Sequence, residues 1–184
     1  TGEYSEHLRA KILSKQVVDY IIKETSSSLE HVVHVVQRVA KNRTTRILLV
    51  DDSRTARVHV GGLLRTQKFL VEEAEDGKAA LEALARHDDI KLVLTDYNMP
   101  KMDGFALTKA IRATRNRHEI AIIGMSGQEN KMLSVRFMKS GASDFIHKPF
   151  MEEELYCRIN QNVEMLERIK ALSQASNCDF LTGF

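Results

Sequence analysis

The sequence predicts an α/β fold in which helices cover both faces of a doubly wound, five-stranded parallel sheet. From Arg46 onward, short apolar runs alternate with longer helical segments, which is the pattern of strands joined by crossover helices. Polar residues follow several of these runs directly, as expected where parallel strands end at a binding crevice. A long helix after Pro149 is expected to close the domain and to continue beyond it as a linker.

Five segments have the length and apolar content of buried strands. They are Arg46–Val50, Phe69–Ala74, Lys91–Thr95, Ala121–Met125 and Asp144–Ile146. Helices are expected between the strands, because Ser, Gly or Asp residues mark where each of these segments begins or ends. The expected helices are Ser53–Gln67, Lys78–His87, Gly104–Ala113 and Glu129–Ser140, followed by the long segment Met151–Ala175.

The composition of the 184 residues, 43% hydrophobic and 28% charged, is ordinary for a soluble globular protein. No apolar run approaches the roughly 18 residues needed to span a bilayer, and a net charge of +2 gives no reason to expect a nucleic-acid or membrane partner. Cys157 and Cys178 form neither a CxxC motif nor a disulfide framework. With no signal peptide at the start, a reducing cytoplasmic location is expected.

Polar residues after four of the apolar runs are expected to meet at the carboxyl-terminal edge of the sheet. They are Asp51, Asp52, Asp96, Ser126 and Lys148. Three carboxylates in one crevice would repel one another, so the group requires a divalent cation and a fixed lysine. The sequence therefore predicts an acidic, magnesium-dependent site that accepts a phosphoryl group.

The spacing of these positions across residues 46–150 resembles the receiver domain of bacterial two-component response regulators, which has a flavodoxin-like fold. The resemblance implies that Asp96 is the phosphoacceptor and that a histidine kinase is the phosphoryl donor. It also implies that Asp51 and Asp52 hold Mg²⁺ together with Asp96. The main-chain carbonyl of Asn98 would complete the metal's coordination shell.

The same resemblance assigns roles to residues around the expected phosphate. Lys148 would pair with the acyl phosphate, and the Lys148–Pro149 peptide bond is expected to be cis. Ser126 would bond a phosphate oxygen after phosphorylation. Phe145 falls at the family's switch aromatic, which is expected to move when Ser126 shifts.

Residues 1–43 are expected to be the C-terminal part of a preceding receiver-like domain. Asp19-Tyr20-Ile21 and Lys23 align with Asp144-Phe145-Ile146 and Lys148 at one constant offset, which indicates an internal repeat. This segment would end in a helix over Ser28–Lys41, and residues 44–151 would form the complete receiver. The alternative is an N-terminal helical hairpin that carries the VDYIIK sequence by chance.

Residues 152–178 are expected to form the last receiver helix and a linker that continues from it. The apolar positions are Leu155, Ile159, Val163, Leu166, Ile169 and Leu172. This stripe suits a helix that packs on its own sheet and then on a second copy in a homodimer. Residues 179–184, DFLTGF, resemble the start of a GGDEF-type diguanylate cyclase domain, which would make cyclic di-GMP. The chain lacks the GG[DE]EF signature and is not expected to be an enzyme itself.

Two other functional classes stay open. A phosphatase of the haloacid-dehalogenase type also uses an aspartyl nucleophile, but it usually needs a DxD start and a cap domain, whereas here the acceptor follows the third strand. A pseudo-receiver that serves as a docking or dimerisation scaffold would not need the complete set of site residues that this sequence carries. No DNA-reading motif follows the receiver segment.

Overall fold

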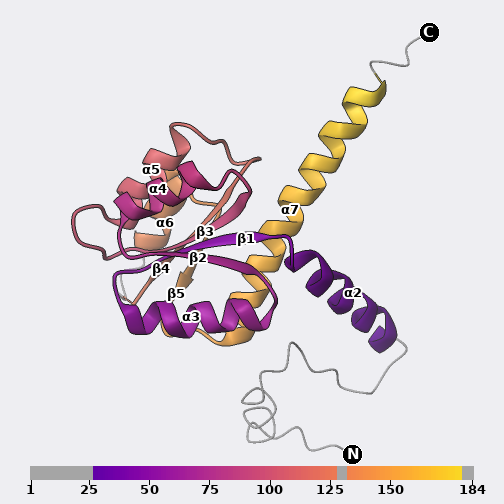
Figure 1. Ribbon diagram of the computed structural model, residues 1–184, viewed down its shortest axis with the longest axis horizontal. Coiled ribbons are helices and arrows are strands. Elements are labelled where there is room, and N and C mark those ends of the chain that lie inside the picture. The colour runs from indigo at the N-terminus through magenta and orange to yellow at the C-terminus, as the bar shows by residue number, and fades with distance from the viewer. Residues whose placement is uncertain (1–26, 128–131, 180–184) are drawn as a thin grey trace, which may run out of the picture.

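The computed structural model describes residues 27–127 and 132–179, in which a parallel sheet lies between two layers of helices (Figure 1). The strands are β1 (Arg46–Val50), β2 (Leu70–Ala74), β3 (Ile90–Asp96), β4 (Ala121–Ser126) and β5 (Asp144–His147). They lie in the order β2-β1-β3-β4-β5, and every neighbouring pair is parallel. This arrangement confirms the predicted doubly wound, flavodoxin-like sheet.

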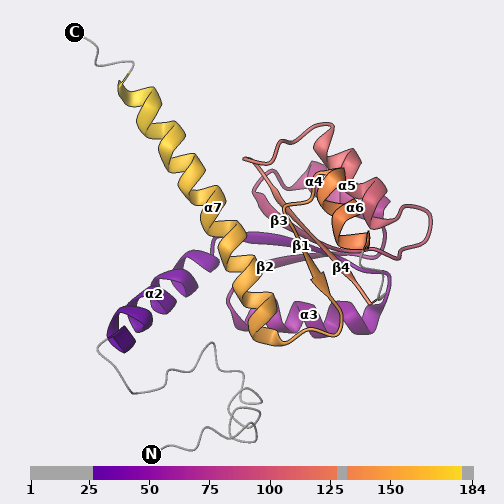
Figure 2. The ribbon, with the colours of Figure 1, turned by 180° about the vertical axis from the view of Figure 1, so that it is seen from behind.

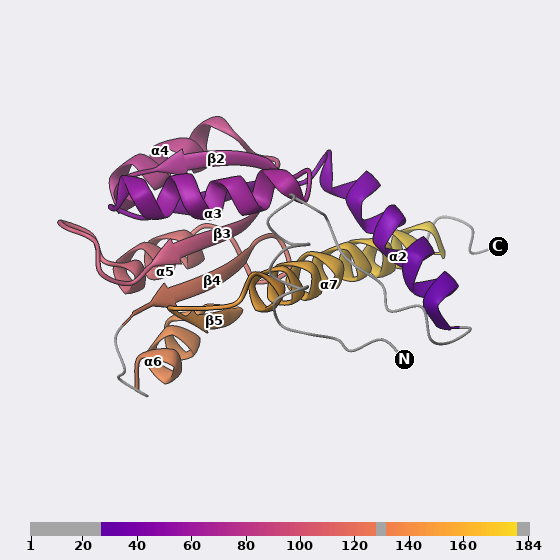
Figure 3. The same ribbon diagram turned by 90° about the horizontal axis from the view of Figure 1, so that it is seen from below.

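Helices cover both faces of the sheet (Figures 2 and 3). They are α2 (Ser27–Asn42), α3 (Arg54–Thr66), α4 (Gly77–Arg86), α5 (Gly104–Arg112), α6 (Met132–Ser140) and α7 (Glu152–Asp179). One apolar cluster joins the sheet to α3 and α7 through residues such as Leu64 and Ile159, and another joins it to α4 and α5 through Leu84 and Leu107. Because both faces of the sheet are covered, the inner strands β1, β3 and β4 are almost continuous buried apolar runs, whereas the edge strand β2 carries two glutamates and is largely exposed or half-buried.

The observed boundaries lie close to the predicted ones. Aspartate or serine side chains cap the first turns of three helices; the capping residues are Ser53 for α3, Asp76 for α4 and Asp103 for α5. β3 includes Asp96, so the predicted phosphoacceptor is the last residue of its strand. α7 continues past the predicted end at Ala175 as far as Asp179, since no Pro or Gly interrupts it.

Some predictions fall outside the described residues. These are the repeat within residues 1–26, the start of the helix expected from Glu129, and the cyclase-like residues 180–184. Among the helices that the structure describes, none is both long and apolar enough to cross a membrane.

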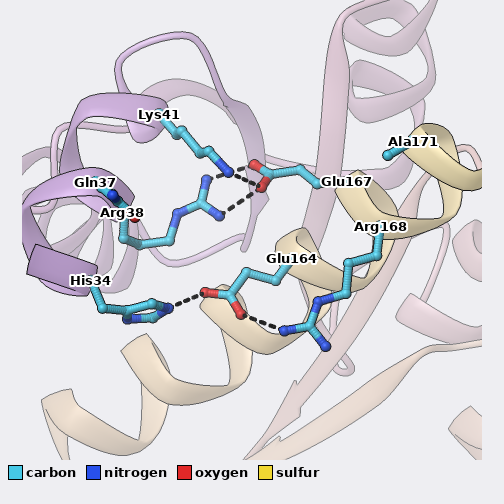
Figure 4. Close-up of a pocket in the computed structure, with 8 residues that line it drawn as sticks. All are labelled: His34, Gln37, Arg38, Lys41, Glu164, Glu167, Arg168 and Ala171. Atoms are coloured by element: carbon cyan, nitrogen blue, oxygen red, sulfur yellow. Dashed lines mark hydrogen bonds and ion pairs between the residues drawn. The ribbon is translucent and has the colours of Figure 1, made fainter. Parts of the chain in front are cut away.

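Ion pairs tie α2 to α7 (Figure 4). Arg38 donates two hydrogen bonds to the Glu167 carboxylate, at 2.7 and 3.1 Å, and Lys41 donates a third at 3.2 Å. His34 lies 3.4 Å from Glu164, and these residues line a hollow of about 300 Å³ between the two helices. Arg38 is only 5% exposed. The C-terminal half of α2 is therefore packed against α7.

Glu167 makes this contact sensitive to pH. Burial raises the pKa of Glu167, but the hydrogen bonds and charges of Arg38 and Lys41 outweigh burial, so the pKa lies below its ordinary value of 4.5. A carboxylate with a lowered pKa stabilises the folded protein above the unfolded-state pKa. That contribution is lost as the pH falls through the folded-state pKa.

Replacing Glu167 with glutamine should lower the free energy of unfolding by about 1 kcal/mol at neutral pH. This value already allows for solvent screening, because the Glu167 side chain is 35% exposed. Urea unfolding should be measured for the wild type and for Glu167→Gln over a range of pH. The difference between their free energies of unfolding should be constant above pH 4.5 and should shrink at lower pH. Glu82→Gln, which removes an exposed pairing with Lys78, is the control and should change little. A difference that persists unchanged far below pH 4.5 would contradict this account.

Candidate functional site

Asp51, Asp96 and Lys148 meet at the carboxyl-terminal edge of the sheet. Lys148 Nζ donates a 2.6 Å hydrogen bond to Asp96 Oδ1 and a 2.7 Å hydrogen bond to Asp51 Oδ2. Asp51 follows β1, Asp96 ends β3 and Lys148 follows β5, so separate parallel strands deliver these side chains to one edge. The ammonium group thereby draws two carboxylates toward one point.

Main-chain N–H groups hold the other oxygen of each carboxylate. The Ser53 N–H donates to Asp51 Oδ1 at 2.9 Å, and the Asn98 N–H donates to Asp96 Oδ2 at 2.7 Å. Each donor lies two residues after its aspartate, which is the local turn that aspartate side chains favour. Asp51 and Asp96 are 2% and 8% exposed. Both buried carboxylates are therefore fixed in orientation by the fold itself.

Burial changes the acidity of the groups at this site. Burial raises the pKa of Asp96. The hydrogen bond and charge of Lys148 and the hydrogen bond from the Asn98 N–H act to lower this pKa, but burial outweighs them, so the pKa of Asp96 lies above its ordinary value. The charge of Asp51 acts in the same direction as burial. For Lys148, burial lowers the pKa, but the two carboxylates outweigh burial and raise it. A cation beside Asp96 thus favours the ionised form that a nucleophile requires.

Asp52 does not join the buried cluster, because its side chain is exposed. Adjacent residues leaving an extended strand point in different directions, so Asp51 turns inward and Asp52 turns toward solvent. Within the part of the chain that the structure describes, no three His, Cys, Asp or Glu side chains are grouped as a metal site. The predicted magnesium ligands Asp51, Asp52, Asp96 and Asn98 therefore stay a prediction.

The chemistry of the donors nevertheless fits a magnesium ion. Asp51 and Asp96 already converge on one cation, the Lys148 ammonium, with hydrogen bonds of 2.7 and 2.6 Å. Mg²⁺ prefers oxygen ligands of this kind and retains several waters, so it needs few protein ligands. Asp52 follows Asp51 in the same loop, and its exposed side chain is not part of this pair.

Ser126 lies beside the cluster, whereas Phe145 belongs to a neighbouring group of aromatic residues. Ser126 ends β4 and is 2% exposed, and its carbonyl accepts a hydrogen bond from the Lys148 N–H at 2.8 Å. The Lys148–Pro149 peptide bond is cis, as predicted. Phe145 on β5 is 7% exposed, so its ring points into the domain. The structure thus brings Ser126 to the site and places Phe145 in the aromatic cluster around Phe137, while the roles of both residues stay predictions.

A row of aromatic rings connects the site to α6. Tyr97, directly after Asp96, packs against Phe105 with ring centroids 5.0 Å apart, and Phe105 packs against Phe137 of α6 at 4.5 Å. Gly124 on β4 leaves room for this ring, since a Cβ there would lie 2.7 Å from Phe137 Cδ1. The position of α6 is therefore set by the strand that ends at the site.

Arg57 is a residue of the site that the sequence did not reveal. It lies in the first turn of α3, and its Nη1 donates to the main-chain oxygens of Asp51 at 2.6 Å and Asp52 at 3.2 Å. The only signal in the sequence is a basic residue soon after the acidic pair. That signal fits Arg54 equally well, so it could not have selected Arg57.

Residues 47–160, more than half of the chain, match the family model of the response regulator receiver domain. The chain belongs to this family. Over 117 residues the chain is 32% identical to the two-component response regulator ORR5 of Oryza sativa subsp. japonica. The matched segment covers 64% of this chain and 87% of the relative.

Solved structures agree with the family. A two-component system response regulator/GGDEF domain protein is 41% identical with a TM-score of 0.85, covering 91% of this chain and 68% of that chain. The chemotaxis protein CheY4 of Vibrio cholerae is 28% identical, with a TM-score of 0.60. The match covers 64% of this chain and 98% of the CheY4 chain. The likeness to the first protein thus extends well beyond the receiver, whereas the likeness to CheY4 is of receiver length.

Proposed function

We propose that this receiver accepts a phosphoryl group on Asp96 from a histidine kinase in a Mg²⁺-dependent reaction and thereby switches the output of an attached domain. The observation that carries the proposal is the convergence of Asp51, Asp96 and Lys148, with both oxygens of each carboxylate hydrogen-bonded. Membership of the receiver family supports it independently.

In the proposed transfer, an Asp96 carboxylate oxygen attacks the phosphorus of the donor phosphohistidine. The new O–P bond forms as the N–P bond breaks, and the donor imidazole leaves and takes up a proton. Lys148 pairs with the transferred phosphoryl oxygens, while the Asn98 N–H stays on the other Asp96 oxygen. A bound Mg²⁺, held by Asp51 and Asp52 with Asp96 and the Asn98 carbonyl, would neutralise phosphoryl charge.

The proposed switch lies in Ser126, Phe145 and α6. An acyl phosphate on Asp96 places new negative charge beside the end of β4, where the Ser126 hydroxyl can donate a hydrogen bond to it. The rings of Phe145 and Phe137 have centroids 5.4 Å apart, so a movement of Phe145 would be felt by α6. We propose that this movement changes the surface formed by α6, β5 and α7.

Incubation with acetyl phosphate and Mg²⁺, followed by borohydride reduction, tests the proposal. Reduction converts an aspartyl phosphate to homoserine, and mass spectrometry of peptides should place it at position 96. Failure to label the folded protein would leave a pseudo-receiver scaffold. Repeated release of phosphate from phosphomonoesters would favour a phosphatase of the haloacid-dehalogenase type.

The attached output domain is proposed to be a diguanylate cyclase. The support is the similarity over 91% of this chain to a response regulator/GGDEF domain protein, together with the cyclase-like residues 179–184. On α7, Met165 is 60% exposed and Leu172 is 71% exposed, with the half-exposed Ile169 between them, which suits packing against a second copy. Light scattering with and without beryllofluoride should show a change in mass or shape; an unchanged particle would contradict a phosphorylation-coupled homodimer.

The domain boundaries are proposed as a preceding receiver-like part in residues 1–43, the receiver in 44–151, the last helix and linker in 152–178 and the cyclase start in 179–184. The described part of α2 supports this division, because Val32, Val33 and Val36 are 38%, 49% and 62% exposed. A preceding domain would cover these valines, as the sheet covers the apolar face of α7. A cytoplasmic location, shared with the kinase, follows from the same proposal.

A further inference from the structure

We propose that Arg57 is a positioning residue that holds the acidic loop after β1 in its metal-binding shape. The inference rests on the proposed function, since it takes this loop to hold Mg²⁺. The Arg57 side chain is 14% exposed, and its Nη1 contacts the main-chain oxygens of both Asp51 and Asp52. Hydrogen bonds from a charged donor are among the stronger ones in proteins.

The place of Arg57 on α3 explains how one guanidinium reaches both carbonyls. Its main-chain N–H donates to the Ser53 carbonyl at 3.0 Å, so Arg57 lies in the first helical turn. A helical side chain points back toward the helix N-terminus, which here is the acidic loop. Ser53 caps the same helix by accepting a hydrogen bond from the Ala56 N–H at 3.3 Å. The cap and the guanidinium together close the loop onto α3.

Different groups hold the main chain and the side chain of Asp51. Arg57 bonds its carbonyl oxygen, while the Ser53 N–H and Lys148 Nζ bond its two carboxylate oxygens. The contacts of Arg57 to the loop are to main-chain oxygens, so it leaves the carboxylates to the metal and fixes the backbone that carries them. Outer groups of this kind orient metal ligands.

Glu73 on β2 lies on the other side of the guanidinium and provides a matched control. Arg57 Nε lies 3.8 Å from Glu73 Oε2, and Arg65 Nη2 donates to Glu73 Oε1 at 2.7 Å. Arg65 therefore shares the helix, the charge and the carboxylate partner of Arg57. Among the described residues, Arg57 forms hydrogen bonds with the acidic loop, whereas the Arg65 side chain donates its hydrogen bond to Glu73.

Charge and position predict opposite effects on the metal. A positive charge near a cation site repels Mg²⁺, so removing Arg57 would tighten binding if its charge alone mattered. Losing a group that orients the ligands would instead weaken binding, by about 10-fold to 100-fold. The sign of the change in Mg²⁺ affinity therefore separates the two roles.

Calorimetric titration with Mg²⁺ alone tests the proposal. It should be carried out on the wild-type chain, Arg57→Ala, Arg57→Lys and Arg65→Ala. Arg57→Ala should weaken binding by about 10-fold or more. Arg57→Lys should weaken it less, because an ammonium group can still donate to one carbonyl, and Arg65→Ala should match the wild type. Amide hydrogen exchange at residues 51–53 in metal-free protein should be faster in Arg57→Ala. Saturating Mg²⁺ should restore its labelling by acetyl phosphate.

An unchanged or tighter Mg²⁺ affinity in Arg57→Ala would overturn the positioning role and leave the proposed function standing. A wild-type chain that binds no Mg²⁺ would overturn both. Urea unfolding in the presence of a chelator identifies a purely structural role, which would lower stability without changing Mg²⁺ affinity, and this result would also overturn the proposal. If Arg57→Ala does not fold, the comparison of Arg57→Lys with Arg65→Lys decides in the same way.

Discussion

Replacing Asp96 with asparagine should abolish labelling of the receiver by acetyl phosphate and its Mg²⁺-dependent binding of beryllofluoride. The amide has nearly the shape of the carboxylate but is not a nucleophile, so no acyl phosphate can form. The fold should persist, since the ionised Asp96 is disfavoured by burial and its pKa is raised. Intact-protein mass spectrometry measures the labelling, and circular dichroism checks the fold.

Asp103→Asn is the matched control for this change. Asp103 lies in the loop after β3 and caps α5, and its Oδ1 accepts a hydrogen bond from the Ala106 N–H at 2.7 Å. Asparagine caps helices about as well as aspartate, so this variant should keep both stability and labelling. Labelling that survives in Asp96→Asn but is lost in Asp103→Asn would mean that the acceptor has been assigned to the wrong residue.

Replacing Phe137 with alanine should lower the free energy of unfolding by about 3 to 5 kcal/mol, because a large buried ring is removed and a cavity remains. Phe137 is 0% exposed and lies against Phe105 at 4.5 Å and Phe145 at 5.4 Å. Gly104 and Gly124 would each place a Cβ within 2.8 Å of its ring, so their lack of a side chain makes room for it. Urea unfolding measures the loss.

Met138→Ala is the control for Phe137, since Met138 is the next residue of α6 and is 41% exposed. Surface changes of this kind usually alter stability by less than about 0.5 kcal/mol. Phe137→Leu, which keeps most of the apolar volume, should lie between the two. Equal losses for Phe137→Ala and Met138→Ala would show that the aromatic row does not anchor α6.

The positions of the site residues could be predicted because strand ends are visible in the sequence. A short apolar run followed by a polar residue places that residue at the edge of a parallel sheet, and this rule brought Asp51, Asp96 and Lys148 together correctly. The rule says nothing of side-chain direction. It placed Asp52 in the same crevice as Asp51 and Asp96, and the structure adds that the Asp52 side chain is exposed while the other two are buried.

Other contacts could not be predicted, because they join residues that carry no motif. Arg57 bonds main-chain oxygens, which are the same for every residue type and leave no trace in the sequence. Arg38 and Glu167 are ordinary helical charges separated by 129 residues, and only the crossing of α2 and α7 makes them partners. Such pairings depend on where whole helices lie, which local patterns do not determine.

The length of α7 has a mechanical consequence. Its 28 residues span about 42 Å at 1.5 Å per residue, and only its first half packs against the sheet. Near the point where α7 leaves the sheet, Arg38 and Lys41 of α2 form hydrogen-bonded ion pairs with Glu167. These pairs hold α7 against α2 at this point. The helix is thus a lever arm, in which a small tilt at the sheet becomes a larger displacement at Asp179. In the proposed switch, a domain attached after Asp179 would therefore be repositioned without a large rearrangement of the receiver core.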